Sequence, residues 1–316
     1  MNGPTRPKVY ITDYTSINIL KRNPKNKGRS TSSKSVLFLS DLSVGTENAV
    51  CSSNPAMKGG SYNPNDLQKK LYQFWVDARD KCPKPHILVL NGEPCDGANV
   101  KQSGDQEWST VIREQLNDAS KLLKMYNPKY FMMTRGSNYH VQLGPDNQEE
   151  QLAEKLNAVP YSAFDLDITR NKREEGAIVR RTDYFLTFRV NGKVFSVTHH
   201  IGFNRWFAYR TTAIAREMAD MEFQRGRYWI SEDMPSVIVR SHAHYFVLVR
   251  FSSVTGFITP AWKFPDGHLF RGGMGGTAPS IGSVEVIVES NGDILVNPHI
   301  LTNSEYPKHN ILDLSD

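Results

Sequence analysis

Residues 87–93 read ILVLNGE, a short apolar run that ends in a loop with a carboxylate. A run of this kind predicts a buried strand, and the residues that follow it form a loop. The same arrangement recurs four more times, with apolar runs that end before Asp41, residues 136–140, His199-His200 and His242-Ala243-His244. Because the carboxyl ends of neighbouring strands meet at one edge of a sheet, we expect these side chains to converge.

Helical patterns separate the predicted strands. Apolar residues at helical spacing predict core-facing helices at 66–80 and 106–126, a shorter helix at 149–157 and a long one at about 206–224. Asn-Gly pairs at 191–192 and 291–292 lie between strand-like runs and predict hairpins, since Asn-Gly favours the type I′ turn. Crossover helices together with hairpins indicate an α/β fold of two packed mixed sheets flanked by helices, rather than one doubly wound sheet.

Composition sets the broad class. A chain of 316 residues with 39% hydrophobic content can bury one large core or two modest ones, which excludes a wholly disordered chain. No apolar run approaches the roughly 18 residues that span a bilayer, and the first residues lack the apolar core of a signal peptide. The three cysteines, Cys51, Cys82 and Cys95, show no paired spacing and predict neither disulfides nor a cysteine zinc site. We therefore expect a cytosolic, reducing compartment and no membrane partner.

Positive charge is concentrated at the amino terminus. Residues 1–34 carry eight lysines and arginines against Asp13 alone, a net charge of +7, whereas the rest of the chain has 30 basic and 32 acidic residues. This basic arm predicts contact with DNA or with an acidic protein surface, and a solvated tail is an equally open interpretation. We divide the chain into the arm (1–34), one domain (35–300) and a tail (301–316).

Carboxylates and imidazoles at the strand ends are the ligands that a borderline divalent ion prefers. An aspartate that ends a strand is, taken alone, more often a turn or capping residue. His242 and His244 are a stronger signal, because alternate residues leaving a strand point to the same side. A carboxylate can also bridge two ions about 3.5 to 4 Å apart, which suits the hydrolysis of phosphate esters. The ordered set predicts a metal site built from Asp41, Glu93, His199, His242 and His244.

The five motifs resemble the calcineurin-like metallophosphoesterase family. Its pattern is Asp-x-His, Gly-Asp-x-x-Asp, Gly-Asn-His-Asp/Glu, a later His and Gly-His-x-His, and the stretches here are DLS at 41–43, GEPCDG at 92–97, GSNYH at 136–140, HH at 199–200 and SHAH at 241–244. The resemblance covers about residues 35–300. It is closest to a bacteriophage branch of the family, on residues 135–140, 235–245 and 259–262. It implies a four-layer αββα sandwich, hydrolysis of a phosphomonoester or phosphodiester, and a manganese, iron or zinc cofactor.

Three positions depart from the family pattern. Ser43 replaces a histidine, Glu93 replaces the bridging aspartate, and Ser137 stands where an asparagine is the ligand, with Asn138 next to it. A hydroxyl is a poor ligand for these metals beside an imidazole, so we predict one or two ions with a weakened second site. Four more residues are candidates, either as further metal ligands or as residues that hydrogen-bond to the ligands and hold them in place: Ser43, Asp96, Asn138 and His200.

Other side chains are candidates for substrate contacts. His140 is the candidate general acid, with an ordinary surface or core histidine as the alternative. Arg205 and Arg210 are candidates for phosphate binding, with a solvated or salt-bridged helix face as the alternative. The aromatic residues near them are interpreted as core and helix packing rather than a base-stacking platform: Trp206, Phe207, Tyr209, Tyr228 and Trp229.

The predicted function is that of a metal-dependent phosphoesterase in a phage context. Its substrates would be phosphodiesters, DNA among them, or phosphomonoesters, and it would act in the host cytoplasm or in the virion. The alternative is a protein of this fold that has lost catalysis and serves as a binding or virion structural component. The altered positions 43, 93 and 137 are consistent with this alternative.

Overall fold

Two mixed sheets run through the part of the chain that the computed structural model describes, residues 32–98, 104–137, 147–160, 180–228, 234–265 and 279–302. The first sheet has the order β13-β12-β1-β4-β5-β6. Its parallel part is β1 (Lys34–Leu39), β4 (Ile87–Asn91), β5 (Tyr130–Thr134) and β6 (Thr182–Asp183). The antiparallel hairpin of β12 (Gly282–Val288) and β13 (Ile294–Ile300) completes it beside β1.

The second sheet has the order β10-β11-β9-β8-β7. Its strands are β7 (Phe185–Val190), β8 (Lys193–Thr198), β9 (Val237–Arg240), β10 (Val247–Arg250) and β11 (Thr255–Ile258), and β9 runs parallel to both β8 and β11. A two-stranded ribbon, β2 (Ala56–Met57) and β3 (Gly60–Ser61), stands apart. The predicted turn at Asn191-Gly192 is confirmed, since both residues have positive φ, 44° and 86°, as a type I′ turn requires.

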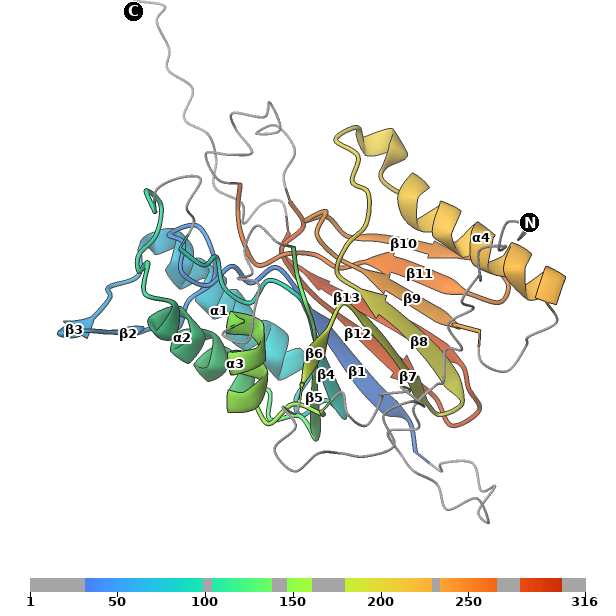
Figure 1. Ribbon diagram of the computed structural model, residues 1–316, viewed down its shortest axis with the longest axis horizontal. Coiled ribbons are helices and arrows are strands. Elements are labelled where there is room, and N and C mark those ends of the chain that lie inside the picture. The colour runs from blue at the N-terminus through green and yellow to red at the C-terminus, as the bar shows by residue number, and fades with distance from the viewer. Residues whose placement is uncertain are drawn as a thin grey trace, which may run out of the picture.

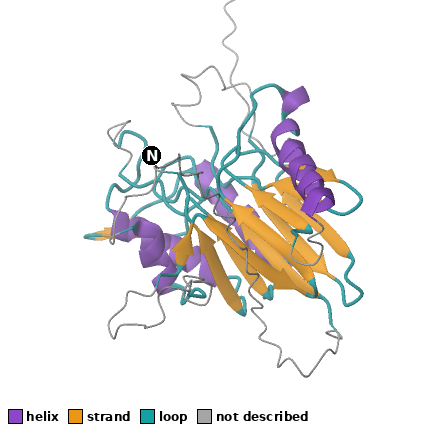
Figure 2. Ribbon diagram, turned by 45° about the vertical axis from the view of Figure 1, so that its right-hand side comes forward, coloured by secondary structure: helices purple, strands orange, loops and turns teal. Residues whose placement is uncertain are grey.

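Helices cover the outer face of each sheet, as Figures 1 and 2 show. On the first sheet lie α1 (Asp66–Lys81), α2 (Ile112–Lys124) and α3 (Gln148–Lys155), and on the second lies α4 (Thr212–Tyr228), preceded by the 3-10 turn η3 (Phe207–Tyr209). No helix within the described ranges is long and apolar enough to cross a membrane.

Strand β1 shows why the sheets stack. Its alternate residues Val36 and Phe38 belong to the apolar layer between the two sheets, whereas Leu37 and Leu39 pack with the helices α1 and α2. A strand buried on both faces must be apolar throughout, which is the pattern found in the sequence. A third apolar layer joins α4 to the second sheet. The predicted αββα sandwich of two mixed sheets is therefore confirmed.

Two predicted helices begin later than expected. Helix α2 starts at Ile112 rather than residue 106, because Trp108 lies in a loop and stacks on Tyr62 with ring centroids 5.3 Å apart. The predicted helix at 206–224 is instead η3 followed by α4. Residues 1–31 and 303–316 lie outside the described residues, so the basic arm and the tail stay predictions.

Candidate metal centre

The loops at the carboxyl ends of four strands meet at a shared edge of the two sheets. Asp41 follows β1 and Glu93 follows β4 in the first sheet, and His199 follows β8 and His242 follows β9 in the second. Backbone hydrogen bonds hold the loops together, from Asp41 N to Gly92 O (3.2 Å) and from Ser241 N to His199 O (3.0 Å).

Buried Asn91 links the strand ends across the sheets. Its side chain donates to Thr198 O (3.0 Å) and to Ser241 Oγ (2.6 Å), both in the second sheet, and it accepts from Thr134 Oγ1 (2.5 Å) in the first. One amide side chain therefore fixes how the two halves of the site face each other. Sequence analysis missed this role, because an asparagine at the end of a strand reads as a turn residue.

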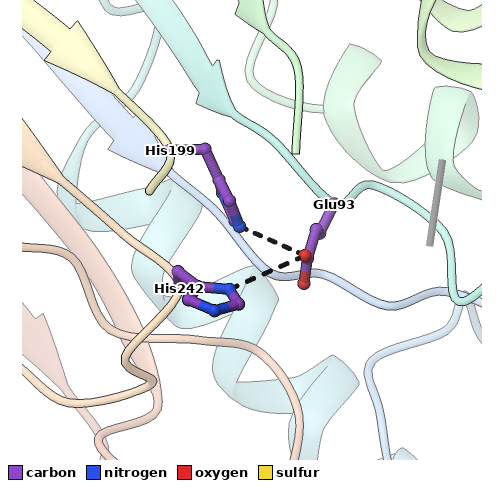
Figure 3. Close-up of side chains that lie close together, drawn as sticks. All are labelled: Glu93, His199 and His242. Carbon is purple, nitrogen blue, oxygen red and sulfur yellow. Dashed lines mark ion pairs between the residues drawn. The ribbon is translucent and has the colours of Figure 1, made fainter. Parts of the chain in front are cut away.

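Two overlapping groups of side chains have the geometry to hold a metal ion. One is Glu93, His199 and His242, and the other is Asp41, Glu93 and His244, with the ligand atoms of each group within 4.8 Å of one another. Figure 3 shows the first group, in which Glu93 Oε1 lies 3.2 Å from His199 Nε2 and 3.9 Å from His242 Nδ1. Glu93 is common to both groups and so occupies the position between two potential ion sites.

His199 is oriented for metal binding. Its Nδ1 lies 2.7 Å from the carbonyl oxygen of Asn91, which can only accept, so Nδ1 carries the proton and Nε2 faces the carboxylates. A second hydrogen bond of this kind is the usual way in which proteins fix a metal-binding histidine.

The backbone at these positions is strained. Left-handed φ is rare in residues other than glycine and costs about 1 to 3 kcal/mol each. Five neighbours in the site have φ between 44° and 68°: Asp41, Ser43, Glu93, His242 and His244. The surrounding hydrogen bonds hold this conformation, which aims the side chains into one region.

The site concentrates negative charge in a buried place. Asp41 and Glu93 are both buried, and Asp41 Oδ1 lies 3.2 Å from His244 Nε2. Burial opposes the charged imidazolium, yet the carboxylates of Glu93 and Asp41 raise the pKa of His199 to about 10. Burial likewise opposes ionisation of Asp41, and its histidine neighbours nonetheless lower its pKa. The pKa of His244 is raised as well, although burial opposes the shift, because Asp41 lies beside it. His199 and His244 therefore favour the protonated form beside the two carboxylates, and a bound ion would supply the same positive charge.

The donors fit a divalent cation. Buried side-chain atoms normally form hydrogen bonds, yet four polar atoms here form none with the described residues: Asp41 Oδ1, Ser43 Oγ, His199 Nε2 and His242 Nδ1. The polar neighbours of Asp41 Oδ1 and His199 Nε2 are other members of the site, His244 and Glu93, each at 3.2 Å. Oxygen and imidazole nitrogen donors suit manganese, iron or zinc.

Glu149 holds two loops of the site in place through hydrogen bonds to their backbone, a role that was not predicted from the sequence. It lies at the start of α3, buried, and its Oε1 accepts hydrogen bonds from Glu93 N (3.0 Å) and Gly136 N (2.9 Å). Burial raises the pKa of Glu149 to about 7, although these backbone donors oppose the shift. The sequence signal was faint: an Asn147 cap before two glutamates indicates only a helix start.

Two glycines, Gly92 and Gly136, allow the loops of the site to lie in close contact with one another. A Cβ at Gly92 would lie 2.5 Å from His199 Nδ1, and a Cβ at Gly136 would lie 2.5 Å from Glu93 Cγ. These contacts are too short for any side chain, so both positions need glycine for steric reasons.

The other predicted site residues have different surroundings. Ser137 donates to Glu93 Oε1 (2.5 Å) and so holds that carboxylate, while buried Asp96 pairs with Lys263 (2.9 Å) and is in neither metal group. His200 is exposed, with its ring centroid 4.7 Å from that of His242. Asn138 and His140 lie outside the described residues.

The predicted packing of three aromatic side chains is wrong. Trp206, Phe207 and Tyr209 are exposed by 63%, 84% and 59%, because they lie in a loop and the η3 turn that precede α4 rather than on its inner face. The two arginines that flank them, Arg205 and Arg210, also precede α4 and do not line a helix. Arg205 lies over the ring of Trp206, and Arg210 lies over Tyr245. Trp229 and the side chain of Tyr228 lie outside the described part.

Comparisons with known proteins give weak similarities. No family model matches the chain. Protein Syd of Pseudoalteromonas translucida (strain TAC 125) is 27% identical over 109 residues, which are 32% of this chain and 61% of that protein, so the chain spans less than two thirds of this relative.

Solved structures with similarity include a single mutant of Vps29 from Entamoeba histolytica (6% identity, 85% of this chain and 99% of that chain, TM-score 0.38). They also include a novel archaeal phosphodiesterase (10%, 84% and 99%, TM-score 0.36) and Yfce, a phosphoesterase from E. coli (12%, 83% and 96%, TM-score 0.33). Each TM-score is below 0.5, so function rests on the geometry of the site itself.

Proposed function

We propose that this chain is a metal-dependent phosphoesterase whose ion is held by the side chains of Asp41, Glu93, His199, His242 and His244. The observation that carries the proposal is the convergence of these five side chains, from loops of two sheets, into two overlapping groups whose ligand atoms lie within 4.8 Å of one another. The order of the strand-end motifs, which resembles that of calcineurin-like phosphoesterases, gives independent support. A bound divalent ion would polarise a phosphate ester and lower the pKa of a water molecule.

The chain's own residues would hold and orient the reacting groups. Glu93, held by Ser137 and by the strained loop, keeps its carboxylate between the two donor groups. His200 is exposed beside His242, and its proposed role is to contact a substrate phosphate. His140 remains the proposed general acid that protonates the leaving alkoxide.

The proposed substrates are phosphodiesters, DNA among them, with phosphomonoesters as the second class, and the proposed ion is manganese, iron or zinc. A phage context, in the host cytoplasm or the virion, belongs to the same proposal, which rests on residues 135–140, 235–245 and 259–262.

The test is metal content together with manganese-dependent hydrolysis of bis-p-nitrophenyl phosphate. We expect His242→Ala to lose bound metal and hydrolysis together, because the substitution removes one of the three proposed ligands of the first group. His86→Ala is the matched control, since His86 lies at the other end of β4 and is expected to retain both. Absence of metal from the wild type, with equal rates in all three proteins, would refute the proposal.

The second candidate is a binding protein of the same fold without turnover. Ser43 favours it, because a buried hydroxyl stands where the resemblance places a histidine ligand. Stoichiometric metal in the wild type with no hydrolysis of any tested ester would support this candidate over the first.

A further inference from the structure

A strip of exposed aromatic side chains lies directly beyond the histidines of the candidate metal centre. We define the aromatic strip as Phe203, Trp206, Phe207 and Tyr209, which are exposed by 56%, 63%, 84% and 59%. Large aromatic side chains are usually buried, and four such side chains within seven residues are a concentration that marks an interaction site rather than scattered surface.

The strip is anchored to the site. Phe203 comes three residues after His200, and its ring centroid lies 6.5 Å from that of His242. Asn204 N donates to the hydroxyl of Tyr245 (3.2 Å), which fixes the start of the strip to the loop that follows β9. A ligand that contacts Phe203, at the start of the strip, is therefore close to His242 of the candidate metal centre.

The charge of this segment is entirely positive. Residues 201–216 contain Arg205, Arg210 and Arg216 and no aspartate or glutamate. The guanidinium of Arg205 lies 5.4 Å from the ring centre of Trp206, and that of Arg210 lies 5.5 Å from the ring centre of Phe207. Cation–π contacts of this kind hold a positive charge beside each ring while leaving the opposite face of the ring available.

Exposed rings with guanidinium groups beside them match one ligand class in particular. Aromatic faces stack on nucleobases whatever their sequence, and arginines bind the phosphates between them. A duplex offers few free base faces, because its bases stack on each other, so the ligand must have unpaired bases. An apolar protein helix would leave the arginines without counter-charges.

We propose that the aromatic strip binds the unpaired bases of a single-stranded nucleic acid and holds its backbone beside the metal centre. The inference rests on the proposed phosphoesterase function, for which it names the substrate class. The strip binds two or more consecutive bases, and Arg205 and Arg210 contact the intervening phosphates.

The test is binding of a fluorescently labelled dT12 oligonucleotide to the full chain in EDTA, followed by anisotropy. Stacking contributes about 1 to 3 kcal/mol per base, so Trp206→Ala with Phe207→Ala should weaken dT12 binding by roughly tenfold or more. The conservative Trp206→Phe keeps a ring and should bind nearly as the wild type does. Phe223→Ala is the matched control, because Phe223 is 68% exposed but lies about three turns along α4.

Two further arms make the outcome decisive. Hydrolysis of bis-p-nitrophenyl phosphate by the Phe223→Ala control should equal that of the wild type, because Phe223 lies on α4 and belongs neither to the strip nor to the metal centre. Binding to a blunt duplex should show no dependence on the strip. Equal dT12 affinity in the wild type and the double variant overturns the inference, as does a loss of binding to anionic lipid vesicles without a loss of dT12 binding.

The EDTA arm separates this inference from the proposed function. If dT12 binding depends on the strip but no metal-dependent hydrolysis is found, the proposed catalysis fails and the strip remains a nucleic-acid site. If hydrolysis of the small ester is found without strip-dependent binding, the substrate class alone is wrong.

Discussion

At the scale of single residues, the candidate site depends on close contacts that permit no extra atoms. Glu93 is held by Ser137 on one side and by Glu149 through its own backbone N–H, and Gly136 lies against both glutamates. Such support fixes a metal ligand within a fraction of an ångström, which is what metal affinity requires. Small changes at these residues should therefore have large effects.

Gly136→Ala should reduce metal binding. The new Cβ would lie 2.5 Å from Glu93 Cγ and 3.2 Å from Glu149 Oε1, so the ligand must move. We expect metal affinity to fall roughly 10- to 100-fold and stability to fall by about 1 to 3 kcal/mol. Isothermal titration with Mn²⁺ and thermal unfolding measure the two effects. Gly202→Ala is the control, because its Cβ would meet nothing within 4 Å.

Glu93→Gln should lower the pKa of His199 in the metal-free protein. The carboxylate of Glu93 is the largest influence that raises this pKa to about 10, and it opposes the effect of burial. With a neutral amide the pKa should move down toward 6.5, which an NMR titration of the histidine ring can follow. An unchanged pKa would mean that Asp41 alone is sufficient to keep the pKa of His199 raised.

At the scale of elements, the strands were predictable and the helix ends were less so. The strand β4 is buried along its whole length, and the apolar run of residues 87–90 bounded by Asn91-Gly92 favours a buried strand. The start of α2 was missed because Trp108 has helical spacing with the residues after it, although it stacks on Tyr62 in a loop. The spacing of apolar residues is the same whether an aromatic side chain belongs to the helix or to the loop before it. It therefore cannot tell where the helix begins.

Asn65→Ala should destabilise α1. Asn65 and Gln68 form a capping box, in which each side chain accepts a hydrogen bond from the other's backbone N–H (2.8 and 3.1 Å). Loss of such a cap typically costs about 1 kcal/mol, and urea unfolding should show a decrease of that size. Asn63→Ala, an exposed asparagine two residues earlier, should have little effect. Equal losses in both variants would contradict the capping role.

At the scale of the whole molecule, two sheets supply different halves of the site. The carboxylates come from the first sheet and the histidines from the second, so the site exists only when the sheets are packed together. Binding of an ion by the proposed ligands would therefore be coupled to folding, and a ligand that binds the native state alone adds about 2.7 kcal/mol of stability at 100 times its dissociation constant.

The metal-free protein should lose stability as the pH rises. The pKa of His199 is raised from 6.5 to about 10 by folding, so its contribution is fully present below pH 6.5 and is lost as the pH rises through about 10. We expect the melting temperature in EDTA to fall between pH 6.5 and 9.5. His199→Gln should flatten this dependence, while His86→Ala should keep it. A melting temperature of the wild type that does not change with pH would contradict a protonated His199 beside Glu93 and Asp41.

Removal of residues 1–31 should weaken DNA binding and reduce its salt dependence. These residues carry most of the positive charge of the predicted arm, and each phosphate contact contributes to the slope of affinity against salt. The deletion leaves every described residue in place. Unchanged affinity with an unchanged salt slope would remove DNA from the proposed partners of the arm.

The sequence by itself determined the buried strands that precede the five motifs, the order of the loops after them and the αββα class, because strand burial and residue type are local properties of short stretches. Only the tertiary structure decided which atoms meet. Asn91 joins the sheets, Glu149 reaches the backbone of Glu93 from 56 residues away, and the aromatic strip faces solvent. These features depend on packing between segments far apart in the chain, where no local pattern carries the information.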